Sequence, residues 1–382
     1  MKDSKVGQKL PKGITHRKGG LYMGRFQYKS ERFVFYGRDL KKLKKELSNK
    51  RYEVEHGLYG KESKMTVNAW FEIWIKEYKT NSIKYGTLVS YKNAYKNHVE
   101  KILGKRKLVD IRPEHVQKIL NGMNGRYSHA TIKLVAIVLN GMYKQAFKNE
   151  IIRRNPVACT TIPRNTEMKR FRVLNLKEQE LFHELSKGSV YCSVYQVALG
   201  TGMRVGELKA LEWSDIDFEN RIIHVSGTLK YRNGNGYYKD TPKTRSSVRD
   251  IPMLDSVYKC LKEQKREQLK YKMSLGAKWS PIKGLEQLVF CREFGKPISH
   301  MALNDDMRKI ETNIREKAEQ FEHIVPHTLR HTFATRGLEN GIPPKVMQDL
   351  LGHTSITMTL DIYSHVLPNT KAKEIQKLAG LF

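Results

Sequence analysis

The spacing of apolar residues changes three times along this chain of 382 residues, and those changes constrain its fold most strongly. Apolar and polar residues alternate as in strands over 13–37, then recur at helical spacing over 64–152. Periodicity is lost over 153–172, and both patterns mix in the remainder. At roughly 100–200 residues per domain, the length suggests two to four domains. We therefore expect a multidomain protein, mainly α with small β-sheets, of the α+β class.

Residues 1–63 have the pattern of a small β-sheet followed by one helix. The run 21–28 alternates, with Tyr22, Phe26 and Tyr28 on one face, and a second run follows over 32–36. Asp39 then precedes leucines at helical spacing whose outer face is covered by lysines. A basic, aromatic module of this kind fits DNA binding, and the alternative is a structural domain with a solvated basic face.

Residues 64–152 predict a bundle of four helices. Thr66, Thr87 and Ser128 precede apolar runs as N-caps, and Pro113 suits a first helical turn. The expected helices begin near 67, 88, 113 and 130. Two prolines and the lack of periodicity then predict an extended linker at 153–172.

Residues 173–382 mix helices and strands. Strands are expected at 221–225 and 236–239 around the turn Asn233-Gly234-Asn235, with a third strand at 248–252. Helices are expected at the following segments: 177–187, 190–200, one opening near 204, 255–273, 300–319, 328–340, 343–351 and a tail helix at 369–380.

The charge of the chain points to a polyanionic partner. The net charge is +31 with a pI of about 9.8, and residues 1–63, 64–155 and 156–382 contribute +10, +12 and +9. Nucleic acid is the usual partner, although ribosomal surfaces and anionic membranes give the same signal. No apolar run has the length of a membrane span, and the N-terminus lacks a signal-peptide pattern. The four cysteines are too far apart for a zinc or redox motif, so we expect reduced thiols in the cytosol.

Two motifs suggest a cofactor and are rejected. The glycines of 200–206 have the wrong spacing for a dinucleotide fingerprint and lack a parallel βαβ context. His327 and His331 have a zinc-compatible spacing, but Thr328 occupies the place of the glutamate that a zinc protease needs. We therefore expect neither a cofactor nor a metal.

Six polar residues in the second half form a set suited to phosphoryl transfer. Two arginine forks can neutralise the non-bridging oxygens of one phosphodiester, and a tyrosine oxygen can be the nucleophile. Each residue alone has an ordinary interpretation, such as a solvated charge, a helix cap or packing. The set comprises Arg204, Lys243, His327, Arg330, His353 and Tyr363.

These residues lie in motifs that resemble those of the tyrosine recombinase, or phage integrase, family. The motifs are TGMRVGE, PKTRSSVR, HTLRHTF and LLGH, followed by Tyr363 ten positions after His353. The resemblance covers essentially the whole chain. It implies an arm-type DNA-binding domain at 1–63, a core-binding domain at 64–152 and a catalytic domain at 173–382 that includes the tail helix.

The resemblance also implies a role for each residue. Tyr363 would attack a scissile phosphate and form a 3′-phosphotyrosine, with Arg204 and Arg330 holding the phosphate oxygens. Lys243 would protonate the leaving 5′-oxygen, His327 would assist proton transfer from Tyr363, and His353 would hydrogen-bond the phosphate. Neither ATP nor a metal is needed for such strand transfer. Glu207 is expected to support the site rather than react.

The implied function is that of an integrase that inserts and excises a mobile element in a bacterium through a Holliday junction. Its expected partners are duplex DNA with core-type and arm-type sites, three further copies of itself in a tetramer, an excisionase and a host DNA-bending protein. It would act in the cytoplasm, at the nucleoid, and the tail helix would dock on a neighbouring protomer. The alternatives are a type IB topoisomerase, a recombinase that resolves chromosome dimers, and a noncatalytic basic architectural protein.

Overall fold

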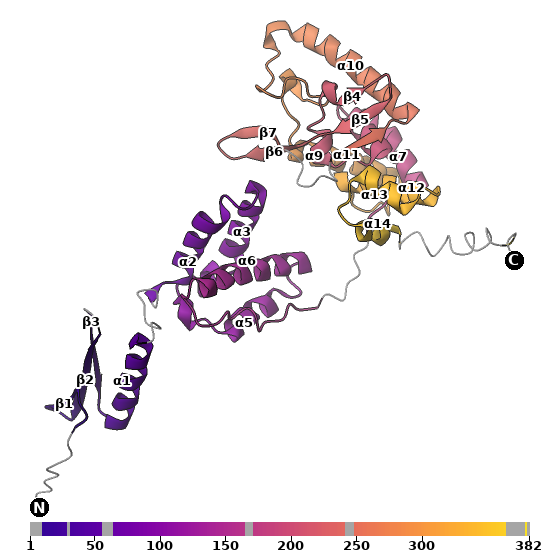
Figure 1. Ribbon diagram of the computed structural model, residues 1–382. Helices are drawn as coiled ribbons and strands as arrows, with labels where there is room; N and C mark the ends of the chain where they lie inside the picture. Colours follow the sequence, from indigo (N-terminus) through magenta and orange to yellow (C-terminus); the bar gives the residue numbers. More distant parts are fainter. Residues whose placement is uncertain are drawn as a thin grey trace, which may run out of the picture. The chain divides into compact units, whose positions relative to one another are not determined.

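The computed structural model describes residues 10–28, 31–55, 64–164, 171–240 and 248–363, together with Ala379. The chain divides into two compact units, Met1–Met168 and Lys169–Phe382. The first holds a small sheet with one helix and a separate group of helices, and the second mixes helices with short strands (Figure 1). The multidomain, mainly helical architecture with small sheets is as the sequence predicts.

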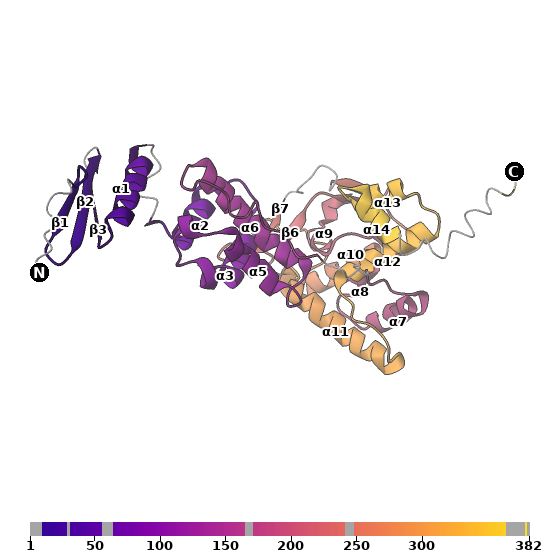
Figure 2. The ribbon, with the colours of Figure 1, turned by 90° about the horizontal axis from the view of Figure 1, so that it is seen from below.

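An antiparallel sheet and one helix form the N-terminal module. The strands β1 (Ile14–Arg17), β2 (Leu21–Tyr28) and β3 (Glu31–Gly37) lie in that order, and α1 (Leu40–Glu55) runs along one face of the sheet (Figures 1 and 2). Asp39 caps the helix, since its Oδ1 accepts from the backbone N–H of Lys41 at 2.8 Å. Leu43 and Leu47 are buried against the aromatic face of the sheet, which gives the module its own core.

The rest of the first unit is a bundle of helices around two tryptophans. Trp70 and Trp74 are almost fully buried, and the Trp70 indole N–H donates to the carbonyl of Met142 at 2.9 Å. Thr66 and Ser128 cap their helices as the sequence predicts, whereas the expected cap at Thr87 is wrong, because α3 already begins at Tyr85 and Thr87 lies inside it. The elements are α2 (Val67–Ile73) with the π-helical segment Trp74–Lys79, α3 (Tyr85–His98), α4 (Glu100–Leu103), α5 (Pro113–Met123) and α6 (His129–Lys148).

Residues 153–164 of the expected linker are held against these helices. Val157 is buried in the helical core, and Ile162 packs on its edge. The Gln117 side chain also bonds both backbone groups of Thr161, each at 2.9 Å. Packing and side-chain hydrogen bonds therefore order this stretch, although it has no regular secondary structure.

The second unit packs helices around a small three-stranded sheet. Its core includes Phe182, Val197, Ile223, Leu303 and Leu329. The helices are α7 (Leu176–Ser186), α8 (Cys192–Thr201), α9 (Val205–Leu208), α10 (Asp255–Leu275), α11 (His300–Lys317), α12 (Pro326–Glu339), α13 (Pro344–Leu351) and α14 (Ile356–Tyr363). The strands are β4 (Ile216–Asp217), β5 (Ile222–Val225), β6 (Thr228–Arg232), β7 (Gly236–Asp240) and β8 (Arg249–Pro252).

The expected pairing of 221–225 with 236–239 is wrong. The hairpin around 233–235 joins β6 to β7, with Arg232 opposite Gly236, whereas β5 pairs with β4 and β8. Ser226-Gly227 separates β5 from β6, so two short strands replace the single strand expected before the turn. The third strand expected at 248–252 is β8, and it extends the sheet of β4 and β5 instead of the hairpin.

Three further expectations concern a membrane span, the tail helix and Lys243. Among the described residues, no helix is long and apolar enough to cross a membrane. The tail helix expected at 369–380 lies outside the described residues apart from Ala379, and so does Lys243.

A pair of glycine substitutions tests the packing around Trp74. A Cβ at Gly141 in α6 would lie 2.9 Å from the Trp74 ring, whereas one at Gly122 in α5 would meet nothing within 4 Å. We expect Gly141→Ala to lower the free energy of unfolding, because overpacking costs about 1–3 kcal/mol. That cost outweighs the roughly 0.5–1 kcal/mol by which alanine stabilises a helix relative to glycine. Gly122→Ala has no such cost and should raise the free energy of unfolding by that amount. Urea unfolding of the full chain measures both, and a shift of the same sign would contradict the packing.

Candidate active site

Two glycines in the left-handed conformation end the helices that frame the site. Gly202 follows α8 with φ 63°, and Gly352 follows α13 with φ 63°. A Cβ at Gly202 would lie 2.4 Å from Phe333 and 2.9 Å from Leu351, so only glycine fits this position. These two turns place the residues that follow them, Arg204 and His353, close to α12.

Arg330 in α12 joins the two helix ends. Its side chain is buried, with the residue 2% exposed, and Nη1 donates to the carbonyl of Gly202 at 2.7 Å. Nη2 donates to the carbonyl of Leu351, also at 2.7 Å. Burial, followed by repulsion from Arg204, lowers the pKa of Arg330, but an arginine remains protonated at neutral pH. The buried charge is thus held by carbonyls that helices leave free at their C-termini.

Arg204 reaches the same helix end from the other side. Nη2 donates to the carbonyl of Gly352 at 2.8 Å, and Nη1 pairs with Oε1 of Glu207 at 2.8 Å. The Arg204 side chain remains one-third exposed. A guanidinium has five N–H donors, and the described residues engage two on Arg204 and two on Arg330. Both arginines therefore retain donors for an anion.

His353 is buried beside these arginines and linked to α14. Its Nδ1 lies 2.9 Å from Oγ1 of Thr359, which is fully buried. Burial, with repulsion from Arg330 and Arg204, lowers the pKa of His353 to about 3. Tyr363 ends α14 one helical turn after Thr359, so the Cα atoms of the two residues lie on the same face of that helix. The side chain of Tyr363 lies outside what the structure describes.

His327 lies in the first turn of α12, one turn before Arg330. Partial burial, together with repulsion from Arg330 and Arg204, lowers its pKa, so the imidazole is neutral at pH 7. Its ring meets that of His331 edge-on, with 5.0 Å between the centroids. Among the described residues, no group of three or more His, Cys, Asp or Glu side chains is arranged to hold a metal ion.

The structure therefore brings Arg204, Arg330, His353 and His327 together and places the backbone of Tyr363 nearby. Lys243 lies between β7 and β8, in a segment outside the described residues. The end of β7 before it is anchored, because Lys239 Nζ pairs with Glu212 at 2.6 Å and with Asp215 at 3.1 Å.

A buried arginine next to these residues was missed in the sequence. Arg249 opens β8, and its Nη2 pairs with Oε2 of Glu207 at 2.9 Å, both side chains being 6% exposed. The signal was the strand alternation, since Arg249 falls on the same face as the buried Ile251. An inward-facing charge on a strand needs a buried partner. Glu207 itself supports Arg204, as expected from the sequence.

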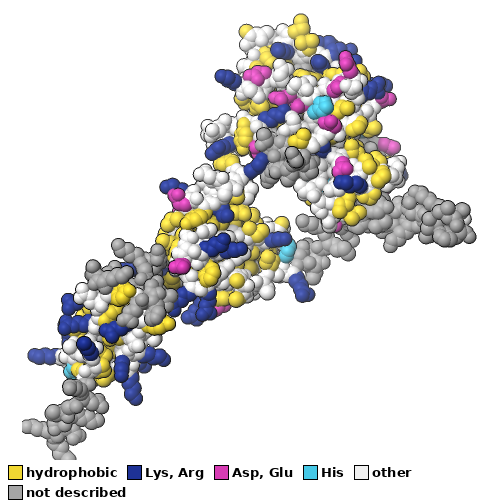
Figure 3. All heavy atoms as spheres, in the orientation of Figure 1, with side chains coloured by type: hydrophobic (Ala, Val, Ile, Leu, Met, Phe, Trp, Pro, Cys, Tyr) yellow, Lys and Arg dark blue, Asp and Glu magenta, His cyan; other side chains and the backbone are white. Residues whose placement is uncertain are grey.

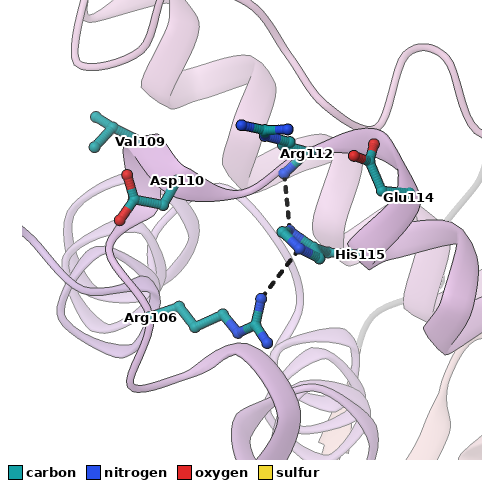
Figure 4. A pocket seen from close by; sticks show the side chains of 6 residues that line it. All are labelled: Arg106, Val109, Asp110, Arg112, Glu114 and His115. Atoms are coloured by element: carbon teal, nitrogen blue, oxygen red, sulfur yellow. Dashed lines mark hydrogen bonds between the residues drawn. The ribbon is translucent and has the colours of Figure 1, made fainter. Parts of the chain in front are cut away.

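A polar hollow lies in the helical part of the first unit and contains none of the predicted site residues. It opens to solvent and is lined by Arg106, Val109, Asp110, Arg112, Glu114 and His115 (Figure 4). The His115 ring lies 3.1 Å from both the Arg106 guanidinium and the backbone nitrogen of Arg112. Its charges have both signs, with two arginines beside Asp110 and Glu114.

Sequence comparison matches most of the chain to one family. The profile of the phage integrase family matches residues 173–370, and that of the N-terminal SAM-like domain of phage integrases matches residues 66–124.

Individual proteins agree with these profiles. The chain is 31% identical over 371 residues to a tyrosine recombinase XerC-like protein of Caldanaerobacter subterraneus subsp. tengcongensis, with 91% of each chain covered. It is 28% identical to the transposase of transposon Tn916 from Enterococcus faecalis, covering 72% of this chain and 68% of that one. The Tn1549 transposon integrase, solved in complex with transposon right end DNA, superposes with a TM-score of 0.71 at 26% identity, covering 82% of this chain and all of that one. The chain thus belongs to the phage integrase family and is a tyrosine recombinase, an enzyme that cuts and rejoins DNA.

Proposed function

We propose that this recombinase inserts and excises a mobile genetic element at specific sites, with Tyr363 as its nucleophile. One observation carries the assignment of the site. Arg204, Arg330 and His353 converge at the C-terminus of α13, and His353 contacts Thr359, which lies one helical turn before Tyr363 in α14. The similarity to transposon enzymes supports the mobile element as the substrate.

The proposed reaction exchanges one phosphoester for another. The Tyr363 oxygen attacks the scissile phosphorus, forms a 3′-phosphotyrosine and expels the 5′-oxygen of the next nucleotide. His327 accepts the tyrosine proton as a neutral imidazole, and Lys243 gives a proton to the leaving oxygen. Attack by the 5′-hydroxyl of a partner strand reverses the step and yields a Holliday junction. Because the phosphodiester energy is kept in the covalent bond, strand transfer requires no ATP.

The arginines supply the main electrostatic stabilisation in this proposal. Negative charge accumulates on the non-bridging oxygens as the pentavalent state forms, and Arg204 and Arg330 retain N–H donors for them. Both guanidinium groups are fixed by carbonyl groups before the reaction, so little reorganisation is needed. Loss of one such group typically costs on the order of 10²–10³ in rate.

The similarity to transposon enzymes favours an integrase over the alternatives. A type IB topoisomerase acts as a monomer at one site. The XerC-like relative covers 91% of this chain and so extends into residues 1–63, and the N-terminal module therefore does not by itself separate an integrase from a recombinase that resolves chromosome dimers. An architectural protein does not need a nucleophile or an arginine pair. We assign residues 1–63 to arm-type sites, 64–152 to core sites and 173–382 to catalysis, with the linker at 153–172.

The outer face of the N-terminal sheet is the proposed arm-site surface. Arg25 and Gln27 of β2 are exposed on this face opposite Val34 and Arg32 of β3, while α1 covers the other face. Lys and Arg side chains are dense over this module (Figure 3). Guanidinium and amide groups on a sheet can contact both phosphates and base edges of a duplex.

The proposed setting is the bacterial cytoplasm, at the nucleoid, where four protomers assemble on DNA. An excisionase and a host DNA-bending protein would direct the reaction towards excision or integration. The tail beyond Tyr363 would link neighbouring protomers.

Tyr363→Phe tests the nucleophile. We expect this variant to form no covalent adduct on a nicked core-site duplex from the junction of the element, while its affinity for that duplex stays within a few-fold, because only the reactive oxygen is lost. Gel analysis after denaturation detects the adduct. Adduct formation by the variant would disprove the assignment.

His353→Ala tests whether His353 acts as a neutral hydrogen-bond donor. A pKa near 3 keeps the ring neutral from pH 6 to 8, because protonation begins only as the pH approaches that value. We expect the variant to be slower on the order of 10². The ratio of wild-type to variant single-turnover cleavage rates should be constant across this range. A ratio that increases as the pH falls through 6.5 would mean that the charged ring participates.

Arg25→Ala/Arg32→Ala tests the arm-site surface. Removal of each side chain that binds a phosphate should reduce the slope of log Kobs against log[salt] by about 0.9. Lys44→Ala/Lys45→Ala removes the same charge from the exposed face of α1 and should leave the slope unchanged. Fluorescence anisotropy with the full chain and a short duplex measures both. Equal slopes for the two double variants would contradict the surface.

A further inference from the structure

Three successive carbonyl groups at the C-terminus of α13 each accept a hydrogen bond from a different arginine. Leu350 accepts from Arg249 Nε at 2.6 Å, Leu351 from Arg330 at 2.7 Å and Gly352 from Arg204 at 2.8 Å. These carbonyls belong to the last turn of the helix and the residue after it, where no further turn supplies N–H groups. The negative end of the helix thus holds three cations together.

Arg249 and Arg204 also share one buried carboxylate. Glu207 Oε2 accepts from Arg249 Nη2 at 2.9 Å, and Oε1 accepts from Arg249 Nη1 at 3.2 Å. The same two oxygens accept from the backbone nitrogen and Nη1 of Arg204, at 2.9 and 2.8 Å. Burial would raise the pKa of Glu207, but the hydrogen bonds and charge of Arg249, with the charge of Arg204, outweigh burial and lower it.

We propose that Arg249 is a positioning residue that holds Arg204 in place for the scissile phosphate. It does so by fixing both partners of the Arg204 side chain, the Glu207 carboxylate and the helix end that presents the Gly352 carbonyl. Arg204 is one-third exposed, so its orientation depends on these fixed acceptors more than on packing. The inference rests on the proposed role of Arg204 in phosphate binding.

The chemistry of the contact explains why arginine occupies this position. Its fork engages both oxygens of Glu207 while Nε reaches the Leu350 carbonyl on another element. A lysine ammonium is a point charge and cannot make this planar set of bonds. Arg249 also balances the negative charge of Glu207. Without Arg249, that charge would offset the charge of Arg204 and would weaken the attraction of Arg204 for a phosphate.

A purely structural ion pair is the competing explanation. Loss of a structural ion pair would lower stability and slow the cleavage of every substrate by the same factor. Loss of a residue that acts through Arg204 should slow cleavage only where Arg204 has a phosphate oxygen to bind. A methylphosphonate replaces one charged non-bridging oxygen with methyl, and its two diastereomers replace either oxygen. The substrate can therefore separate the two explanations.

The test compares Arg249→Gln, Arg249→Lys, Arg204→Ala and a matched control in the full chain. The control is Arg336→Gln, because Arg336 also bonds a carbonyl and a carboxylate, those of Leu174 and Glu339, in the same unit, and within the described chain neither partner bonds Arg204 or Arg330. Covalent adduct formation is measured in single turnover on nicked duplexes with a phosphodiester or either methylphosphonate at the scissile position. Duplex affinity and thermal unfolding are measured alongside.

We expect both Arg249 variants to cleave the phosphodiester more slowly by about 10–10², since small misplacements of a reacting group cost up to that much. Their affinity for DNA should change little. On one methylphosphonate diastereomer, their cleavage rates should fall only a few-fold below that of the wild type. The rate of Arg204→Ala should recover on that same diastereomer. Arg336→Gln should match the wild type on all substrates.

Contrary results separate the inference from the proposed function. If Arg204→Ala cleaves the phosphodiester as fast as the wild type, the proposed role of Arg204 is wrong. The other outcomes start from an Arg204→Ala variant that cleaves slowly. If the Arg249 variants then cleave as fast as Arg336→Gln, only the positioning role is wrong. The same holds if their rates are reduced equally on all three substrates. Arg249→Lys keeps the charge and secures the test if Arg249→Gln does not fold, and full activity of Arg249→Lys would also overturn the role of the fork.

Discussion

A buried arginine needs acceptors that cannot move, and the ends of two helices supply them here. Arg330 binds the carbonyl of Gly202 beyond α8 and that of Leu351 at the end of α13. An unpaired charge at this depth would cost several kcal/mol. The contact therefore couples the folding of both turns to the formation of the site, because neither turn can shift without leaving the guanidinium unpaired.

The two short motifs around these turns follow from the same constraint. Each helix must end abruptly so that its last carbonyls face the arginine, and a left-handed glycine ends a helix in this way. At Gly202 the approach of Phe333 and Leu351 leaves no room for a side chain. The proposed site residues Arg204 and His353 come two residues and one residue after these glycines, because the turn sets the direction of the chain there.

The sequence predicts local features of this molecule well and long-range ones less well. The helix caps at Thr66 and Ser128 form as expected, since capping depends on residues only a few positions apart. The predicted strand partner of β5, 236–239, was wrong, because its partner β8 lies farther along the chain and local sequence does not specify such a pairing. Arg204, Arg330 and His353 were identified through their motifs, whereas Arg249 was not singled out in the sequence. Only its place on the buried face of β8 distinguishes it, and that requires correct strand alternation.

The distribution of charge reflects two physical tasks. Residues 1–155 carry most of the net charge of +31, largely as exposed lysines and arginines, and exposed charges act on DNA through many weak, salt-screened contacts. Catalysis requires few charges, but these must be desolvated and fixed, because a low local dielectric strengthens each interaction with a developing negative charge. The second unit therefore supplies its buried cations with fixed partners, a buried glutamate and four helix-end carbonyls, instead of adding more cations.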